Sequence, residues 1–376
     1  MTQAVIAGYA RSAFTPAKKG GLSRVRPDEL TAEIIRALIT RTGVIPEDIE
    51  DLITGCAFPE GEQGLNVARL IALLAGLPLG VAGATVNRFC GSSMTSIHMA
   101  AGAIALGAGE VFLCAGVESM SRIPMGGFNP LPSPKLYAAK PEAYIGMGDT
   151  AENVAERWHL TRAAQEEFAL ASHRKAIAAQ SAGHFDAEIV PLGPVTRDEC
   201  PRADASAEAL AALKPAFAKS GTVTAGTSSP LTDGASAVLV CSEAYARAHN
   251  LPLLARIKSV AVAGCAPEIM GIGPVAASRK ALARAGIEAK DLDIIELNEA
   301  FASQALACIH DLGLDPAKVN LDGGAIALGH PLGATGARIT GKAASLLKRE
   351  GGKYALATQC IGGGQGIATV LEAITP

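Results

Sequence analysis

Apolar residues along the chain fall into short runs of strand length and longer stretches with helical spacing. Residues 4–8, 51–57 and 111–119 are short runs of mostly apolar residues, whereas residues 27–42 and 66–75 carry apolar positions three and four residues apart. Strands that alternate with helices in this way predict an α/β fold, with a largely parallel sheet covered by helices on both faces.

The stretch 84–107, ATVNRFCGSSMTSIHMAAGAIALG, joins the two patterns at Cys90. The β-branched pair Thr85 and Val86 precedes the cysteine, and helical spacing of small and apolar residues follows it, which predicts a strand, a tight turn and a buried helix. Free backbone N–H groups and the helix macrodipole at such a start predict a lowered pKa and a nucleophilic thiolate. The simpler alternative is an inert core cysteine.

The character of the sequence changes after Ser119. Residues 120–222 are richer in charge and proline, contain a helical pattern at 161–180, and are interpreted as an inserted segment. An apolar strand at 235–241 then returns to the first sheet. We therefore divide the chain into an N-terminal half (1–119, completed by about 223–255), an inserted loop domain (120–222) and a C-terminal half (256–376).

The last third of the chain repeats the first. GVIPEDIEDLI at 43–53 has a counterpart in GIEAKDLDIIEL at 286–297, at an offset of about 240 residues. The same offset aligns Cys90 with His330 in GGAIALGHPLGATG. Two similar halves related by a pseudo-two-fold axis would bring both helix starts to the centre, so the repeat predicts that this cysteine and this histidine meet.

Three further residues are candidates for chemistry. A histidine at a helix start, such as His330, is expected to stay neutral. Cys360 ends a predicted strand and enters IGGGQG, whose backbone N–H groups could hold an oxyanion; the strand-like IATVLEAI after it argues against a nucleotide loop. Asn298 closes a predicted strand in ELNEAFASQ, where helix capping is the simpler interpretation.

The composition of the chain narrows the classes of protein to which it could belong. The 376 residues are 49% hydrophobic with 41 glycines but only 4% aromatic, which indicates a compact α/β enzyme core packed through small side chains. A net charge of −3 argues against nucleic acid as a partner. The eight cysteines form no C-x-x-C pair, so we expect no metal site, free thiols and a reducing cytoplasm. The sequence contains no apolar run of about 18 residues, so no transmembrane segment is expected.

Five motifs occur in the order and with the spacing of the thiolase family: VNRFCGSSM, GTVTAGTSSPLTDGA, NEAFASQ, GGAIALGHPLG and CIGGGQGIA. The chain therefore resembles this family over nearly its whole length. NRFCGSS, with IMGIGPVAAS at 269–278, is more similar to the degradative 3-ketoacyl-CoA thiolases than to the acetoacetyl-CoA-forming branch. The resemblance implies a thiolase-like fold of two similar βαβαβαββ halves, with a layered α-β-α-β-α core and an inserted loop domain.

The resemblance also implies roles for individual residues. Cys90 would be the acylated nucleophile, and Cys360 the acid/base that protonates the departing acetyl-CoA carbanion and deprotonates CoA. His330 would activate Cys90 and, with a water held by Asn298, stabilise the enolate oxygen. The N–H groups of Cys90 and Gly362 would hold the oxyanion. Residues implied to contact CoA or substrate are Arg202 at the nucleotide, Ser229 at the pantetheine, and Met147, Phe217, Ala300 and Phe301 along the channel.

The activity implied is CoA-dependent cleavage of 3-ketoacyl-CoA in fatty-acid β-oxidation, with acyl-CoA and CoA as ligands, CoA as co-substrate and no tightly bound cofactor. The resemblance further implies a homodimer or dimer of dimers and leaves open a β-oxidation multienzyme partner. Alternatives are biosynthetic condensation, a non-catalytic acyl-CoA or lipid carrier, and a ketoacyl synthase, which is expected to lack Cys360. Gly146, where many acetoacetyl-CoA thiolases have histidine, favours a longer or bulkier acyl chain.

Overall fold

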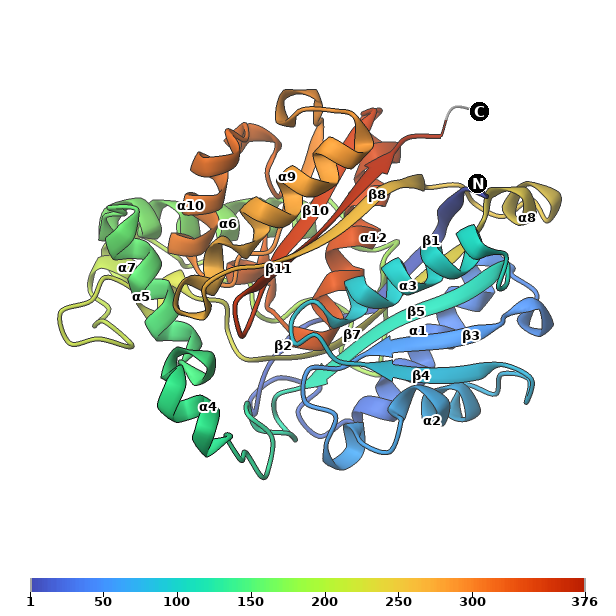
Figure 1. Ribbon diagram of the computed structural model, residues 1–376, viewed down its shortest axis with the longest axis horizontal. Helices are drawn as coiled ribbons and strands as arrows, with labels where there is room; N and C mark the ends of the chain where they lie inside the picture. Colours follow the sequence, from blue (N-terminus) through green and yellow to red (C-terminus); the bar gives the residue numbers. More distant parts are fainter. Residues whose placement is uncertain (1, 375–376) are drawn as a thin grey trace.

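The computed structural model describes residues 2–374 as one mixed sheet flanked by helices (Figure 1). The strands are β1 (Ala4–Ser12), β2 (Thr15–Pro16), β3 (Asp51–Gly55), β4 (Ala82–Val86), β5 (Val111–Ser119), β6 (Ile189–Val190), β7 (Thr232–Ser242), β8 (Ala255–Gly264), β9 (Ile294–Leu297), β10 (Tyr354–Ile361) and β11 (Gln365–Glu372). The α-helices are α1 (Pro27–Thr42), α2 (Val67–Leu74), α3 (Ser92–Leu106), α4 (Pro134–Ala139), α5 (Met147–Arg157), α6 (Arg162–Ser181), α7 (Ala207–Ala211), α8 (Glu243–Ala248), α9 (Gly273–Ala285), α10 (Ala302–Leu312), α11 (Ala325–Leu328) and α12 (Leu332–Glu350).

The sheet consists of two similar halves in the order β4-β3-β5-β7-β1 and β8-β11-β10-β9. They join only through β1 and β8, which pair at Val5 with Arg256 and Ile6 with Ala255. Counted outward from this junction, the second strand of each half, β7 or β11, is antiparallel to both neighbours. The predicted repeat of two similar halves is therefore confirmed.

The expectation of a largely parallel sheet is wrong. Among the strands of residues 2–374, parallel pairing is limited to β3 with β4 and β5, β9 with β10, and the short β6 with β1. In the second half, β10 and β11 are joined only by residues 362–364, and so short a connection requires antiparallel strands. In the first half, β7 takes the corresponding antiparallel place, although the inserted segment separates it from β5 in the sequence.

Helices cover both halves of the sheet and fill the space between them. One core cluster contains apolar side chains of α1, α2 and the first half, and a second contains those of α9, α10 and the other half. A third cluster combines α3 and α12 with both halves, so these two helices form the central layer (Figure 1). The order α-β-α-β-α predicted by the resemblance is confirmed.

The two central helices approach each other through backbone. Gly336 of α12 lies so close to α3 that a Cβ atom built on it would be 2.3 Å from the Met94 nitrogen. By length and composition, the stretch Phe89–Leu106 containing α3 could cross a membrane, with a mean hydropathy of 1.2. In the fold, α3 packs against α12 and the inner face of the sheet.

The inserted segment is tied to the first half by buried charge. The Arg11 guanidinium on β1 donates to Glu188 at 2.8 Å and to Asp198 at 2.7 Å, and all three side chains are buried. Burial of one charge without its partners would cost several kcal/mol. The pairing therefore holds this part of the segment against the sheet, while α4, α5 and α7 lie at its outer side (Figure 1).

We predict that Gly336→Ala destabilises the protein by about 1–3 kcal/mol because the added methyl group meets backbone atoms of α3 that cannot rotate away. Alanine favours the helix over glycine by about 1 kcal/mol, so the same substitution in an isolated helix would make that helix more stable. Urea unfolding at fixed protein concentration measures the difference.

Ser345→Ala is the matched control on the same helix. Its hydroxyl donates to the carbonyl of Gly341 within α12, and its loss should change stability by no more than about 0.5 kcal/mol. A Gly336→Ala protein as stable as the wild type would contradict the close approach of α3 and α12.

Candidate active site

Cys90 lies in the turn between β4 and α3, two residues before the helix begins. The preceding residue, Phe89, has a φ of +43°, a left-handed conformation that a bulky residue rarely adopts. The thiol is half-buried and shares an apolar cluster with Leu332, the first residue of α12. The turn therefore presents the cysteine at the junction of the two central helices.

The pKa of Cys90 differs from the sequence-based expectation. Burial raises the pKa of the Cys90 thiol to about 12, and the negative charge of Glu118 acts in the same direction. The backbone N–H groups of Gly362 and Cys90 itself point at the sulfur and lower the pKa, but by less than burial raises it. The predicted lowered pKa is wrong because loss of hydration outweighs these N–H groups. The resting form is the neutral thiol, which needs a base.

His330 lies two residues before α12, the counterpart of the position of Cys90 before α3. It is buried, and burial together with the charge of Arg338 lowers the pKa of its imidazole to about 3. The expectation of a neutral imidazole is confirmed. A neutral ring can accept a proton and later donate it.

Asn298 follows β9 and is fully buried. Its Nδ2 atom lies 3.3 Å from Nε2 of His330, and its backbone N–H donates to the carbonyl of Thr358 on β10. Capping does not explain it, because α10 begins only at Ala302. The structure thus brings Asn298 and His330 together from segments 32 residues apart.

Cys360 lies near the end of β10 and is buried. Burial raises its pKa, and the next largest cause is charge on Cys90. Gly362, two residues on, directs its N–H at Cys90. The end of β10 therefore brings a second thiol and a hydrogen-bond donor to the nucleophile.

Apolar residues line one side of these groups. Met147 begins α5, Ala300 and Phe301 precede α10, and all three belong to the cluster that contains Cys360. Phe217 from the inserted segment packs edge-on against Phe301, with ring centroids 6.0 Å apart, and is itself 45% exposed. The four predicted channel residues thus form a continuous wall.

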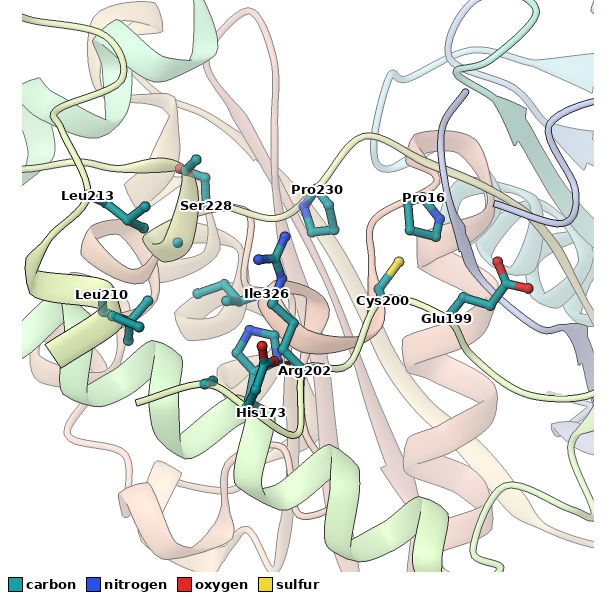
Figure 2. A pocket seen from close by; sticks show the side chains of 15 residues that line it. Pro16, His173, Glu199, Cys200, Arg202, Leu210, Leu213, Ser228, Pro230 and Ile326 are labelled. Carbon is teal, nitrogen blue, oxygen red and sulfur yellow. Dashed lines mark hydrogen bonds between the residues drawn. The ribbon is translucent and has the colours of Figure 1, made fainter. Parts of the chain in front are cut away.

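A cavity of about 470 Å³ lies between the inserted segment and residues 225–230 that follow it, and Pro16 and Ile326 also line it (Figure 2). Arg202 and His173 lie together on one wall, where the backbone N–H of Arg202 donates to Nδ1 of His173 at 3.2 Å. Ser228, rather than Ser229, is among the lining residues. The backbone N–H of Ser229 donates to the Ala300 carbonyl instead, at 3.0 Å.

One side of this cavity lies next to the start of β7, where Thr232 contacts His330. Pro230 lines the cavity, and its carbonyl accepts a hydrogen bond from the Thr232 hydroxyl. That hydroxyl in turn accepts the backbone N–H of His330 at 3.0 Å. This link reaches His330 through its backbone, and the cavity lining includes none of Cys90, His330, Asn298 and Cys360.

Three buried side chains at this site were not singled out by sequence. Gln359, next to Cys360, donates to the carbonyl of Cys90. Glu118 accepts N–H groups from Ala57 and from Gly333 at 2.9 Å each, linking the two halves. The third is Thr335, which contacts the ring of His330. Glutamine and threonine carry no motif signal, and their roles depend on tertiary contacts. Over residues 2–374, no cluster of three or more His, Cys, Asp or Glu side chains could hold a metal ion.

Family models match both halves of the chain. "Thiolase, N-terminal domain" matches residues 4–244 and "Thiolase, C-terminal domain" matches residues 251–373. Full-length relatives named 3-ketoacyl-CoA thiolase include one from Bacillus subtilis (strain 168), 46% identical over 99% of this chain and 100% of the relative. Another, from Shewanella sp. (strain ANA-3), is 49% identical over 100% of both chains.

A solved structure is similar throughout. The Bacillus anthracis acetyl-CoA acetyltransferase superposes with a TM-score of 0.91 at 40% identity, covering 100% of this chain and 99% of the other. The two family models, the full-length relatives and the shared fold agree: the chain belongs to the thiolase family.

Proposed function

We propose that the protein is a 3-ketoacyl-CoA thiolase that cleaves 3-ketoacyl-CoA with CoA as co-substrate, giving acetyl-CoA and a shortened acyl-CoA. The observation that carries this proposal is that Cys90 lies near a second thiol, Cys360, and packs against the start of α12, next to the hydrogen-bonded pair of His330 and Asn298. Support also comes from relatives named 3-ketoacyl-CoA thiolase at 46–49% identity. We further propose a place in fatty-acid β-oxidation; the eight free cysteines support a reducing cytoplasm.

In the first half of the reaction, Cys90 attacks the 3-keto carbon of the substrate. His330 takes the thiol proton, and the N–H groups of Cys90 and Gly362 stabilise the alkoxide that forms. The bond between C2 and C3 then breaks and leaves the acyl group on Cys90. The acetyl-CoA enolate, whose oxygen is held by His330 and a water on Asn298, takes a proton at C2 from Cys360.

In the second half, the resulting Cys360 thiolate deprotonates CoA, which attacks the acyl-enzyme and releases acyl-CoA. A charge on Cys90 raises the pKa of Cys360, so two thiolates would disfavour each other. Cys90 is neutral as the acyl thioester, and it therefore does not oppose the thiolate at Cys360 during the second half.

Biosynthetic condensation is the second candidate, favoured by the similarity to the acetyl-CoA acetyltransferase. Gly146 opposes a short-chain preference, because it places no side chain before Met147 at the channel wall. Thiolysis rates on a ladder of 3-ketoacyl-CoA chain lengths separate the two candidates. Absence of thiolysis at every length would overturn the proposed function and favour a non-catalytic carrier.

We predict that Cys360→Ala still forms an acyl-enzyme from acetyl-CoA, while thiolysis of 3-ketoacyl-CoA falls by about 10²- to 10⁴-fold. Acyl transfer needs only a thiolate and an oxyanion site, whereas C–C cleavage expels a carbanion that must be protonated. Mass spectrometry of the Cys90 peptide and steady-state rates measure the two steps.

Cys90→Ala should lose both reactions. Cys241→Ala, which removes a buried thiol on β7, is the control and should lose neither. An acyl group found on Cys360, or near-normal thiolysis by Cys360→Ala, would show that the roles of the two cysteines are misassigned.

We propose that Arg202 contacts the nucleotide end of CoA at the outer wall of the cavity. Arg202→Ala should raise KM for CoA with little change in kcat, because the contact is the same in ground and transition states. Arg197→Ala, an exposed arginine of the same segment outside the cavity lining, should change neither. A large fall in kcat at saturating CoA would contradict this placement.

We also propose a homodimer built on the edge of the first half. Strand β4 ends the sheet. Leu79, three residues before β4, is 80% exposed, and Leu106, at the end of α3, is 86% exposed. An unpaired edge beside exposed apolar residues is a surface that a second copy can cover.

Leu106→Glu should convert the dimer to a monomer in sedimentation velocity runs, because the charge would be buried at the interface. Leu131→Glu, which changes an equally exposed leucine of the inserted segment, is the control and should leave at least a dimer. A Leu106→Glu protein that sediments like the wild type would place the interface elsewhere.

A further inference from the structure

The ring of His330 is held from both sides by buried hydrogen-bonding groups. Its Nδ1 lies 2.6 Å from the hydroxyl of Thr335, and that hydroxyl lies 3.1 Å from the carbonyl of Pro331. On the other side, Nε2 lies 3.3 Å from Nδ2 of Asn298. His330, Thr335 and Asn298 are each no more than 4% exposed, so bulk water does not compete for these contacts.

A neutral imidazole carries one N–H proton. The hydrogen bonds to Thr335 and Asn298 allow that proton to sit on either Nδ1 or Nε2. If the Thr335 hydroxyl donates to the Pro331 carbonyl, its oxygen accepts the proton on Nδ1 and leaves Nε2 as a bare acceptor. If the hydroxyl instead donates to Nδ1, the proton sits on Nε2 and Asn298 must turn its oxygen toward the ring. Only the first arrangement leaves a base at Nε2.

Two features favour the first arrangement. Thr335 lies in the first turn of α12, four residues after Pro331, where a threonine hydroxyl commonly donates to the carbonyl one turn back. Asn298 presents its amide nitrogen to Nε2, and its Oδ1 has no partner among the described residues. A donor facing Nε2 matches a ring nitrogen that carries a lone pair.

We propose that Thr335 is a positioning residue that fixes the tautomer of His330, holding the proton on Nδ1 so that Nε2 is the base for Cys90. This inference rests on the proposed thiolase function. Nothing in the motif comparison assigned Thr335 a role, because its effect passes entirely through the histidine.

The assignment connects the two halves of the reaction. Nε2 accepts the proton from Cys90 Sγ, and the ring becomes an imidazolium with N–H groups at both nitrogens. Nδ1 continues to donate to Thr335. The new Nε2–H no longer accepts from the Asn298 amide and can donate to the enolate oxygen of acetyl-CoA. The proton returns to Cys90 sulfur when the second half is complete, so the ring ends in its starting tautomer.

The test compares Thr335→Val with Thr335→Ser and with a matched control, Thr340→Val. Thr340 is also buried on α12, and its hydroxyl donates one turn back to Gly336, with no histidine beside it. Thr335→Val should lower kcat for thiolysis by about 100-fold with KM for CoA within about twofold. It should also move the pH profile of iodoacetamide alkylation at Cys90 to higher pH, because the thiol has lost its base.

Thr335→Ser keeps the hydroxyl and should restore both kcat and the alkylation profile to within about threefold of the wild type. Thr340→Val should match the wild type in both. Equal behaviour of Thr335→Val and Thr340→Val would overturn the proposal, as would failure of serine to restore the rate.

Nitrogen-15 NMR of histidine-labelled wild-type protein reads the tautomer directly, whether or not Thr335→Val folds. His330 is picked out of the seven histidines by its loss in His330→Gln. A proton on Nδ1 is expected, and a proton on Nε2 would overturn the assignment. Lack of thiolysis by the wild type would instead overturn the proposed function while leaving this tautomer measurement decisive for Thr335.

Discussion

The backbone contact between α3 and α12 is the constraint on which the active site depends. At Gly336 there is no room for a side chain against Met94, so the two helices can pack only at this distance. Each helix begins two residues after its functional residue, Cys90 or His330. Packing the helices through small residues therefore places a thiol and an imidazole from opposite halves of the sheet at one point.

Burial at that point decides the protonation states. Loss of hydration raises the pKa of Cys90 and Cys360 and lowers that of His330, so all three groups rest in their neutral forms. Loss of hydration disfavours the ion pair that forms when Cys90 gives its proton to His330, so the negative charge that develops needs hydrogen-bond donors. The helix start still contributes, because N–H groups aimed at the sulfur are also those that can hold a developing oxyanion.

Supporting side chains keep this geometry in place. Glu118 accepts N–H groups from the loop after β3 and from the start of α12, so one carboxylate spans the two halves. On the other side of α12, Lys342 pairs with Glu188 at 3.0 Å and Asp322 at 2.6 Å, all buried. Removal of one charged side chain from such a buried set would leave its partner unpaired and destabilise the protein. The central helix is thus fixed at its first turn and at its middle.

Local pattern in the sequence determined the elements and their repetition. The helix expected at 27–42 is α1, those at 66–75 and 161–180 agree with α2 and α6 within one residue at each end, and the offset of 240 aligned Cys90 with His330. Periodicity and turn residues act over a few positions, which is why these features could be predicted. Only the tertiary structure decided the antiparallel places of β7 and β11, the raised pKa of Cys90, and the contacts of Gln359 and Thr335. These depend on strand pairing and dehydration between segments far apart in the chain, which no local pattern records.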